Sequence, residues 1–260
     1  MPRFTYLPEE TQRRAEQADE LLGDILPVRV VSDAPLGATL GNPAADLRGL
    51  TEMMMDTVDE PELLHRLMAH LRDATLSAMD AAEAAGFLTP NNSGPMICSD
   101  PIWPQDGPIT FANLWCMANS QEFDQISPAM WEEFCLAYQM PIFARFGLVA
   151  YGCCENLTQK MDGVLRIPNL RIFVCSAWTN LDTVIERVGD RYTIMWRQKA
   201  SDVVFAEDEH ALRAALEDGL RRLRGCHVQI VLRELQTLAG NLDRLHIWTH
   251  LAKEAAQRYA

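Results

Sequence analysis

From Asn113 to Tyr259, short apolar runs alternate with longer segments of helical periodicity, and this alternation limits the possible folds more than any other feature. The runs expected as strands are Asn113–Asn119, Leu148–Cys153, Leu170–Ser176, Tyr192–Trp196 and His227–Leu232. Near-continuous apolar strands joined through helices are typical of a parallel sheet covered on both faces. The sequence therefore predicts an α/β fold with right-handed crossovers.

Helices are expected between these strands and ahead of them. After the strands they cover Leu157–Val164, Asn180–Val188, Glu209–Leu223 and Leu242–Tyr259. Upstream they cover Thr11–Leu22, a long amphipathic segment from Asp59 to Ala85 that Gly86 stops, and a segment that Ser127-Pro128 opens and Gly147 ends. Leu26–Ser32 is expected as a further short β segment.

Both a closed barrel and an open doubly wound sheet satisfy this alternation. No Gly-x-Gly-x-x-Gly follows any expected strand, so the dinucleotide-binding form of the open sheet has no support. A chain of 260 residues, of which 48% are hydrophobic and 23% charged, suits one globular domain built as a parallel barrel. We expect a (β/α)8 TIM-barrel-like fold.

Charge and cysteine usage exclude several classes of protein. The formal net charge of −13 repels phosphate backbones and anionic lipid, so neither nucleic acid nor membrane is an expected partner. Apolar stretches such as Phe146–Cys154 are far shorter than the ~20 residues that cross a bilayer, and the N-terminus has no basic and apolar leader. Seven cysteines without framework spacing suit a reducing compartment. A cytoplasmic location is expected.

Two adjacent cysteines, Cys153 and Cys154, stand where an expected strand meets its helix. Barrel enzymes place their chemistry at this carboxyl end of the strands. A thiol here can bind a metal or act as a thiolate, whereas one of two neighbouring strand residues can equally pack inside the barrel. We favour function for Cys153 and packing for Cys154.

Polar and aromatic residues follow the neighbouring strands. Glu155 lies just beyond one strand, and Gln121 and Glu122 lie just beyond the preceding one. Their side chains can converge there as an acid, a base or metal ligands. Exposed acidic residues in loops are also common in so acidic a chain. Trp178, Trp196 and Lys199 follow later strands and are candidates for substrate binding. Large aromatic residues also plug barrel ends, and for Trp196 the two readings are equally favoured.

Four stretches resemble a known superfamily. They are Asp59-Glu60-Pro61-Glu62-Leu63-Leu64-His65-Arg66-Leu67-Met68, Ser127-Pro128 with Trp131-Glu132-Glu133-Phe134 ahead of Pro141, Phe146-Gly147 leading to Tyr151-Gly152-Cys153-Cys154-Glu155, and Gly240-Asn241-Leu242-Asp243-Arg244-Leu245. From Asp46 to Tyr259 the chain resembles the uroporphyrinogen decarboxylase superfamily, in the branch with Tyr-Gly-Cys-Cys-Glu. The resemblance implies a distorted (β/α)8 barrel over residues 46–260, an N-terminal extension over residues 1–45, and a barrel short of its N-terminal strands.

The same resemblance implies an activity. The decarboxylases use an Arg-rich N-terminal motif that is absent here, so porphyrinogen decarboxylation is not expected. The cobalamin-dependent methyltransferases hold zinc with a His-x-Cys pair and a later Cys. Cys153 matches the Cys of the His-x-Cys pair, and Tyr151 stands where these methyltransferases have the His. No cysteine lies at Ile230–Gln236, so Glu155, Glu234 or a His would have to complete the metal site.

Two classes of function remain open after this comparison. One is a methyltransferase-like enzyme with Glu155 and Tyr151 as catalytic residues, Cys153 on zinc, a small-molecule substrate and a corrinoid (cobalamin) on a partner protein. The alternative is a non-catalytic binding or partner subunit with the same barrel fold. Because a barrel short of strands exposes sheet edges, we also expect a homodimer with the N-terminal ~50 residues and the loop Thr89–Pro108 near its interface.

Overall fold

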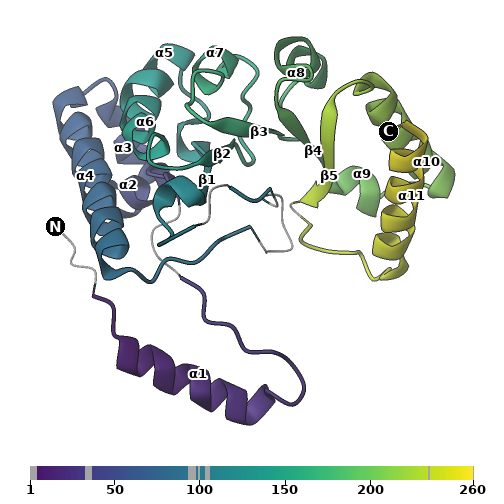
Figure 1. Cartoon of the computed structure of the whole chain (residues 1–260). Coiled ribbons are helices and arrows are strands. Elements are labelled where there is room, and N and C mark those ends of the chain that lie inside the picture. The colour runs from purple at the N-terminus through teal and green to yellow at the C-terminus, as the bar shows by residue number, and fades with distance from the viewer. Residues whose placement is uncertain are drawn as a thin grey trace. The chain divides into compact units, whose positions relative to one another are not determined.

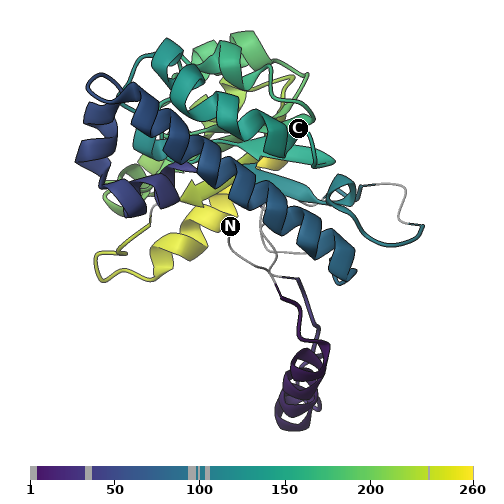
Figure 2. The same cartoon turned by 90° about the vertical axis from the view of Figure 1, so that its left-hand side faces the viewer.

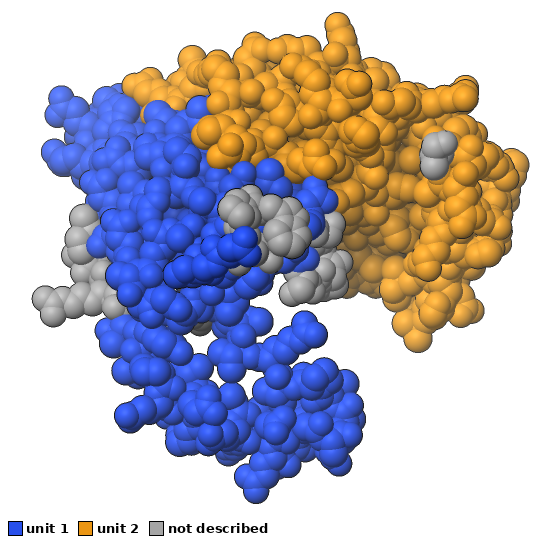
Figure 3. All heavy atoms as spheres, in the orientation of Figure 1, with its two compact units in different colours: residues 1–117, 134–148 blue, residues 118–133, 149–260 orange. Residues whose placement is uncertain are grey.

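A computed structural model describes residues 5–32, 37–92, 98, 100–102, 106–233 and 235–259 (Figures 1 and 2). These residues divide into two compact units (Figure 3). Unit 1 contains residues 1–117 and 134–148, and unit 2 contains residues 118–133 and 149–260. Among the described residues, no helix is both long enough and apolar enough to cross a bilayer.

Unit 1 is mainly helical. Its elements are α1 (Pro8–Leu22), α2 (Gly41–Arg48), α3 (Leu50–Asp56), α4 (Pro61–Ala85), η1 (Phe111–Asn113), most of β1 (Trp115–Ala118) and α6 (Ala137–Phe143). The long helix α4 packs against α2, α3 and α6 and buries Leu64, Met68 and Met79. Gly86 ends it in the left-handed region at φ 67°, as its position after an apolar periodic segment predicts.

The beginning of unit 1 differs from the rest, because none of the residues of α1 is buried. Leu26–Ser32, expected as a β segment, forms no strand, so that prediction is wrong. Leu26, Val30 and Val31 are 60%, 52% and 67% exposed, so this apolar segment pairs with no strand among the described residues.

The strands form one five-stranded parallel sheet in the order β1-β2-β3-β4-β5, which is also their order in the chain (Figure 1). After β1 come β2 (Leu148–Tyr151), β3 (Leu170–Cys175), β4 (Thr193–Lys199) and β5 (His227–Arg233). The longest register joins β4 to β5, from Thr193 opposite His227 to Lys199 opposite Arg233. The α/β class and the parallel sheet are thus confirmed, while closure into a (β/α)8 barrel stays a prediction.

Helices connect the strands of unit 2. They are η2 (Gln121–Phe123), α5 (Pro128–Trp131), α7 (Met161–Val164), α8 (Leu181–Val188), α9 (Ala200–Val204), α10 (Glu209–Arg222) and α11 (Asp243–Tyr259), while η3 (Glu132–Leu136) runs from unit 2 into unit 1. Helices α10 and α11 pack together through an apolar cluster that includes Leu212, Leu216 and Leu251. Burying these side chains is worth about 1.5–3 kcal/mol each, which holds the last two helices together.

Candidate functional site

The segment after β2 makes a sharp turn at Gly152. Its φ of 114° is one that residues with a side chain rarely adopt, and a Cβ there would stand 3.0 Å from Val174 and Leu157. Its N–H donates to the carbonyl of Ala118 over 2.8 Å. Glycine therefore lets the chain leave β2 close against β3, with Cys153, Cys154 and Glu155 directly after the turn.

Glu155 is a buried carboxylate that joins three loops. It is 2% exposed, and its Oε1 accepts the N–H of Ser120 while its Oε2 accepts the N–H of Cys153, both over 2.8 Å. Its own carbonyl accepts the hydroxyl of Ser176 over 2.8 Å and that of Thr179 over 3.3 Å. Segments that follow β1, β2 and β3 are thus tied to one residue, which gives Glu155 a positioning role.

Burial raises the pKa of the Glu155 carboxyl above its usual range, because desolvation disfavours the charged form. The N–H groups of Ser120 and Cys153 and the charge of Lys160 act in the opposite direction. Lys160 is itself buried, and its Nζ donates to the carbonyls of Phe123 and Asp124 over 2.7 and 2.9 Å. This lysine therefore holds the loop after β1 in place.

Cys153 is held from two sides. Besides its bond to Glu155, its carbonyl accepts Nη1 of Arg197 over 2.6 Å, and the same nitrogen lies 3.5 Å from its Sγ. Arg197 comes from β4 and is 3% exposed. The Sγ atoms of Cys153 and Cys154 are 3.6 Å apart, and both residues are half-buried. The result is a fixed dithiol beside a guanidinium.

Tyr151 and Trp196 lie in packed surroundings. The buried Tyr151 ring meets Trp131 edge-on with centroids 6.3 Å apart. Trp196 lies against α10, where a Cβ on Gly219 would come within 2.1 Å of its indole ring. It also packs against the apolar cluster of α10 and α11. Both rings are held by packing, and Trp196 also lines a cavity together with Lys199 and Arg222, so its role in substrate binding stays a prediction.

Trp178 is more accessible, being 60% exposed, and the Nζ of Lys199 lies 5.2 Å from the centre of its ring. It borders a cavity of about 640 Å³ formed by the loops after β1, β2 and β3. Polar side chains dominate the lining of this cavity, which consists of Asp124, Gln125, Ile126, Ser127, Pro128, Asn156, Thr158, Gln159, Lys160, Trp178 and Asn180. Its size and polar groups suit a small polar molecule.

Gln121 and Glu122 lie in η2, directly after β1. Within the part of the chain that the structure describes, Gln121 Oε1 and Glu122 Oε2 are shielded from solvent and have no hydrogen-bond partner. A buried acceptor without a donor costs about 1–3 kcal/mol. Neither side chain lines the larger cavity, so the binding of a substrate by these two residues stays a prediction.

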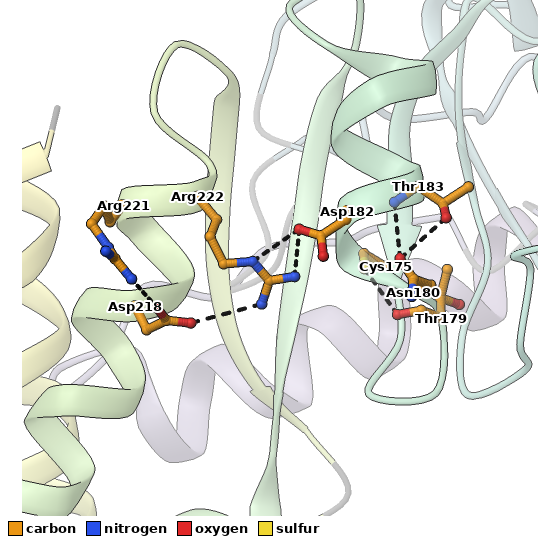
Figure 4. A network of polar contacts seen from close by, with 8 residues as sticks. All are labelled: Cys175, Thr179, Asn180, Asp182, Thr183, Asp218, Arg221 and Arg222. Carbon is orange, nitrogen blue, oxygen red and sulfur yellow. Dashed lines mark hydrogen bonds and ion pairs between the residues drawn. The ribbon is translucent and has the colours of Figure 1, made fainter.

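A second, smaller cavity of about 240 Å³ lies between the end of β3, β4 and α10. Arg222 of α10 borders it and is bonded to Asp182 of α8 over 2.6 Å and paired with Asp218 over 3.8 Å (Figure 4). Asn180 caps α8 by accepting the N–H of Thr183, and the thiol of Cys175 donates to the carbonyl of Thr179. This network joins α8 to α10, and its charges compensate one another.

The structure brings some of the expected site residues together and leaves others apart. Cys153 and Glu155 share a hydrogen bond, and Trp178 meets Lys199, whereas Tyr151 and Trp196 are in separate packing contacts. Among the described residues, no three His, Cys, Asp or Glu side chains are grouped to hold a metal ion. Glu234 lies outside the described residues.

Sequence reasoning missed Arg197 and Ser120. The available signal for Arg197 was a charged residue directly after the expected strand Tyr192–Trp196, because that strand continues to Lys199 and brings the guanidinium into the sheet. Ser120 contributes its backbone N–H together with its hydroxyl, and a backbone donor leaves no trace in the residue types.

The fold and this site define an α/β protein whose polar groups gather where parallel strands end. No protein-family model matches the chain, and no curated protein matches it. Among solved structures it is similar to a methyltransferase from Methanosarcina mazei, at 12% sequence identity and a TM-score of 0.55. The match covers 94% of this chain but 63% of the methyltransferase, so the likeness concerns the fold.

Proposed function

We propose that this protein is a methyltransferase-like enzyme of the uroporphyrinogen decarboxylase superfamily, acting on a small molecule at the carboxyl end of its sheet. One observation carries the proposal: in a fold shared with a methyltransferase, the Cys153 thiol is fixed after β2 between Glu155 and Arg197. The motif Tyr151 to Glu155, by which the sequence resembles that superfamily, occupies the same turn.

The contacts of each residue indicate its role in the proposed reaction. Glu155 orients the backbone of Cys153, and Arg197 places a positive charge beside its sulfur. Trp178 offers an aromatic face at the larger cavity, and Lys199, which lies beside its ring, offers a cation at the smaller one. Gln121 and Glu122 offer acceptors for polar groups of the substrate. A corrinoid on a partner protein, when bound, supplies or accepts the methyl group.

Zinc does not fit the described residues in the form that the superfamily implies. Tyr151 is packed against Trp131, Glu155 is occupied by two N–H groups, and no three metal-binding side chains gather among the described residues. The proposed methyl transfer therefore contains no step through zinc.

The experiment is a methyl-transfer assay on the full chain. Methylcobalamin is incubated anaerobically with a panel of small thiols, with and without the protein, and the methyl thioether is measured by mass spectrometry. We expect thioether formation above the protein-free rate for at least one thiol: the Co–C bond of the added methylcobalamin breaks, the sulfur forms the new C–S bond, the thiol proton passes to solvent and cob(I)alamin is released. A rate equal to the protein-free rate throughout the panel would contradict the proposal.

The alternative is a non-catalytic binding or partner subunit, and one observation favours it. Helix α1 has no buried residue, and its Leu21 and the following Ile25 and Leu26 are 69%, 70% and 60% exposed, which suits docking to a partner or a second copy. Light scattering tests docking to a second copy, because a mass of two chains supports the homodimer and a mass of 29.3 kDa contradicts it.

A further inference from the structure

The two adjacent thiols differ from most other cysteines of the chain. Cys153 and Cys154 are half-buried, whereas Cys98, Cys116, Cys135 and Cys175 are buried. Burial raises the pKa of the Cys98 and Cys175 thiols to about 12, so these two remain protonated at neutral pH. The pair after β2 is therefore better placed than the buried cysteines to bind a thiophilic ligand.

The distance between the two sulfurs decides what they can do together. Two thiolates, each ~2.3 Å from one ion, lie about 3.8 Å apart at a tetrahedral angle and about 4.6 Å apart when the ion is two-coordinate and linear. The Sγ atoms of Cys153 and Cys154 are 3.6 Å apart, so one two-coordinate ion binds both once the side chains turn and the sulfurs move about 1 Å apart. A disulfide fits less well, because adjacent Cα atoms lie ~3.8 Å apart and disulfides usually span about 4.4–6.8 Å.

The surroundings of the pair favour a complex with a negative charge. Glu155 and Arg197 hold the backbone of Cys153 through its N–H and carbonyl, so little ordering is needed on binding. Nη1 of Arg197 lies 3.5 Å from the sulfur of Cys153. A monovalent ion with two thiolates carries one net negative charge, which this guanidinium compensates.

We infer that Cys153 and Cys154 form a two-thiolate site for a soft monovalent metal ion, with Cu(I) as the fitting example. Thiolates select such ions, whereas zinc requires further protein ligands that are not grouped among the described residues. On binding, two S–H protons pass to solvent, two Cu–S bonds form, and copper keeps its oxidation state. The site does not depend on the proposed methyl transfer.

The test is an anaerobic titration of the full chain with Cu(I) in competition with a chromogenic Cu(I) chelator, and with Zn²⁺ in parallel. Wild type is compared with Cys153→Ser, Cys154→Ser and the control Cys226→Ser, which alters the other half-buried thiol. Circular dichroism verifies folding of each variant. We expect one copper per chain, with affinity reduced by about tenfold or more in either single variant and unchanged in the control.

Proton release gives a second measurement, with two protons expected per copper in weakly buffered solution. Copper affinity that is the same in wild type and in the Cys153→Ser/Cys154→Ser double variant would overturn the inference. Stoichiometric zinc that requires both sulfurs and resists displacement by Cu(I) would also overturn it. Neither result bears on the thioether assay, so the two proposals fail separately.

Discussion

The backbone N–H of Cys153 donates to Oε2 of Glu155 over 2.8 Å, so the carboxylate fixes a thiol-bearing residue two positions before it. The other carboxylate oxygen accepts the N–H of Ser120, which follows β1. One acidic side chain therefore sets the geometry at the ends of two strands. Its loss affects both stability and the position of Cys153.

Replacing Glu155 with alanine leaves two buried N–H groups without an acceptor, at a cost of about 1–3 kcal/mol each. We expect Glu155→Ala to lower the free energy of unfolding by about 2–5 kcal/mol, and Glu155→Gln, which keeps one acceptor, to lower it less. Urea unfolding measures both. Glu207→Ala, at an exposed acidic residue, is the control. A Glu155→Ala variant as stable as this control would show that the carboxylate is dispensable.

The pKa of Glu155 also predicts a pH dependence. Because burial raises the pKa in the folded state above the unfolded value of 4.5, the folded state binds more protons between these two values. The contribution of the Glu155 carboxyl to the free energy of unfolding is complete below pH 4.5 and is lost as pH rises through the pKa of the folded state. The stability of wild type minus that of Glu155→Gln should fall over this window. A difference that is constant or rises with pH would contradict the assigned direction.

Gly219 in α10 lies against the indole of Trp196, where a Cβ would come within 2.1 Å of the ring. Alanine usually stabilises a helix interior by about 1 kcal/mol relative to glycine, so the sign of the effect is informative. We expect Gly219→Ala to destabilise the protein by about 1–3 kcal/mol through overpacking. In a Trp196→Leu background the penalty should disappear. Calorimetry that shows stabilisation by Gly219→Ala alone would refute the contact.

Native-state alkylation tests which thiols are accessible. With iodoacetamide at pH 8, Cys153 and Cys154 should be modified in the folded protein, while Cys98, Cys116 and Cys175 react only after unfolding. Cys226 should react slowly, because partial burial raises the pKa of its thiol. Peptide mass spectrometry assigns each site. Equal labelling of Cys175 and Cys153 in the native state would contradict the described burial.

Much of the fold was predictable from apolar patterning. The strands β1, β2, β3 and β5 lie within one residue of the expected segments or inside them, because each is a nearly continuous apolar run. β4 runs three residues beyond its expected end, since Arg197 and Gln198 are polar yet buried. The helix expected from Leu157 begins only at Met161, because Thr158 bonds to the side chain of Asn156 in a turn.

The site was predictable only where neighbours in sequence are neighbours in space. Cys153 and Glu155 are two residues apart and their contact follows from one turn, whereas Arg197 reaches Cys153 through strand register. The packing of Trp196 depends on the absence of a side chain at Gly219, which no pattern around the tryptophan reveals. Long-range contacts of this kind are set by tertiary structure.

The most direct test of the account compares thioether formation by Cys153→Ala and Cys226→Ala, both verified as folded, in the methylcobalamin assay. If Cys153 is the centre of the site, its replacement lowers kcat/KM by about tenfold or more, and Cys226→Ala stays within about twofold of wild type. A Cys153→Ala variant with the wild-type kcat/KM would contradict the account.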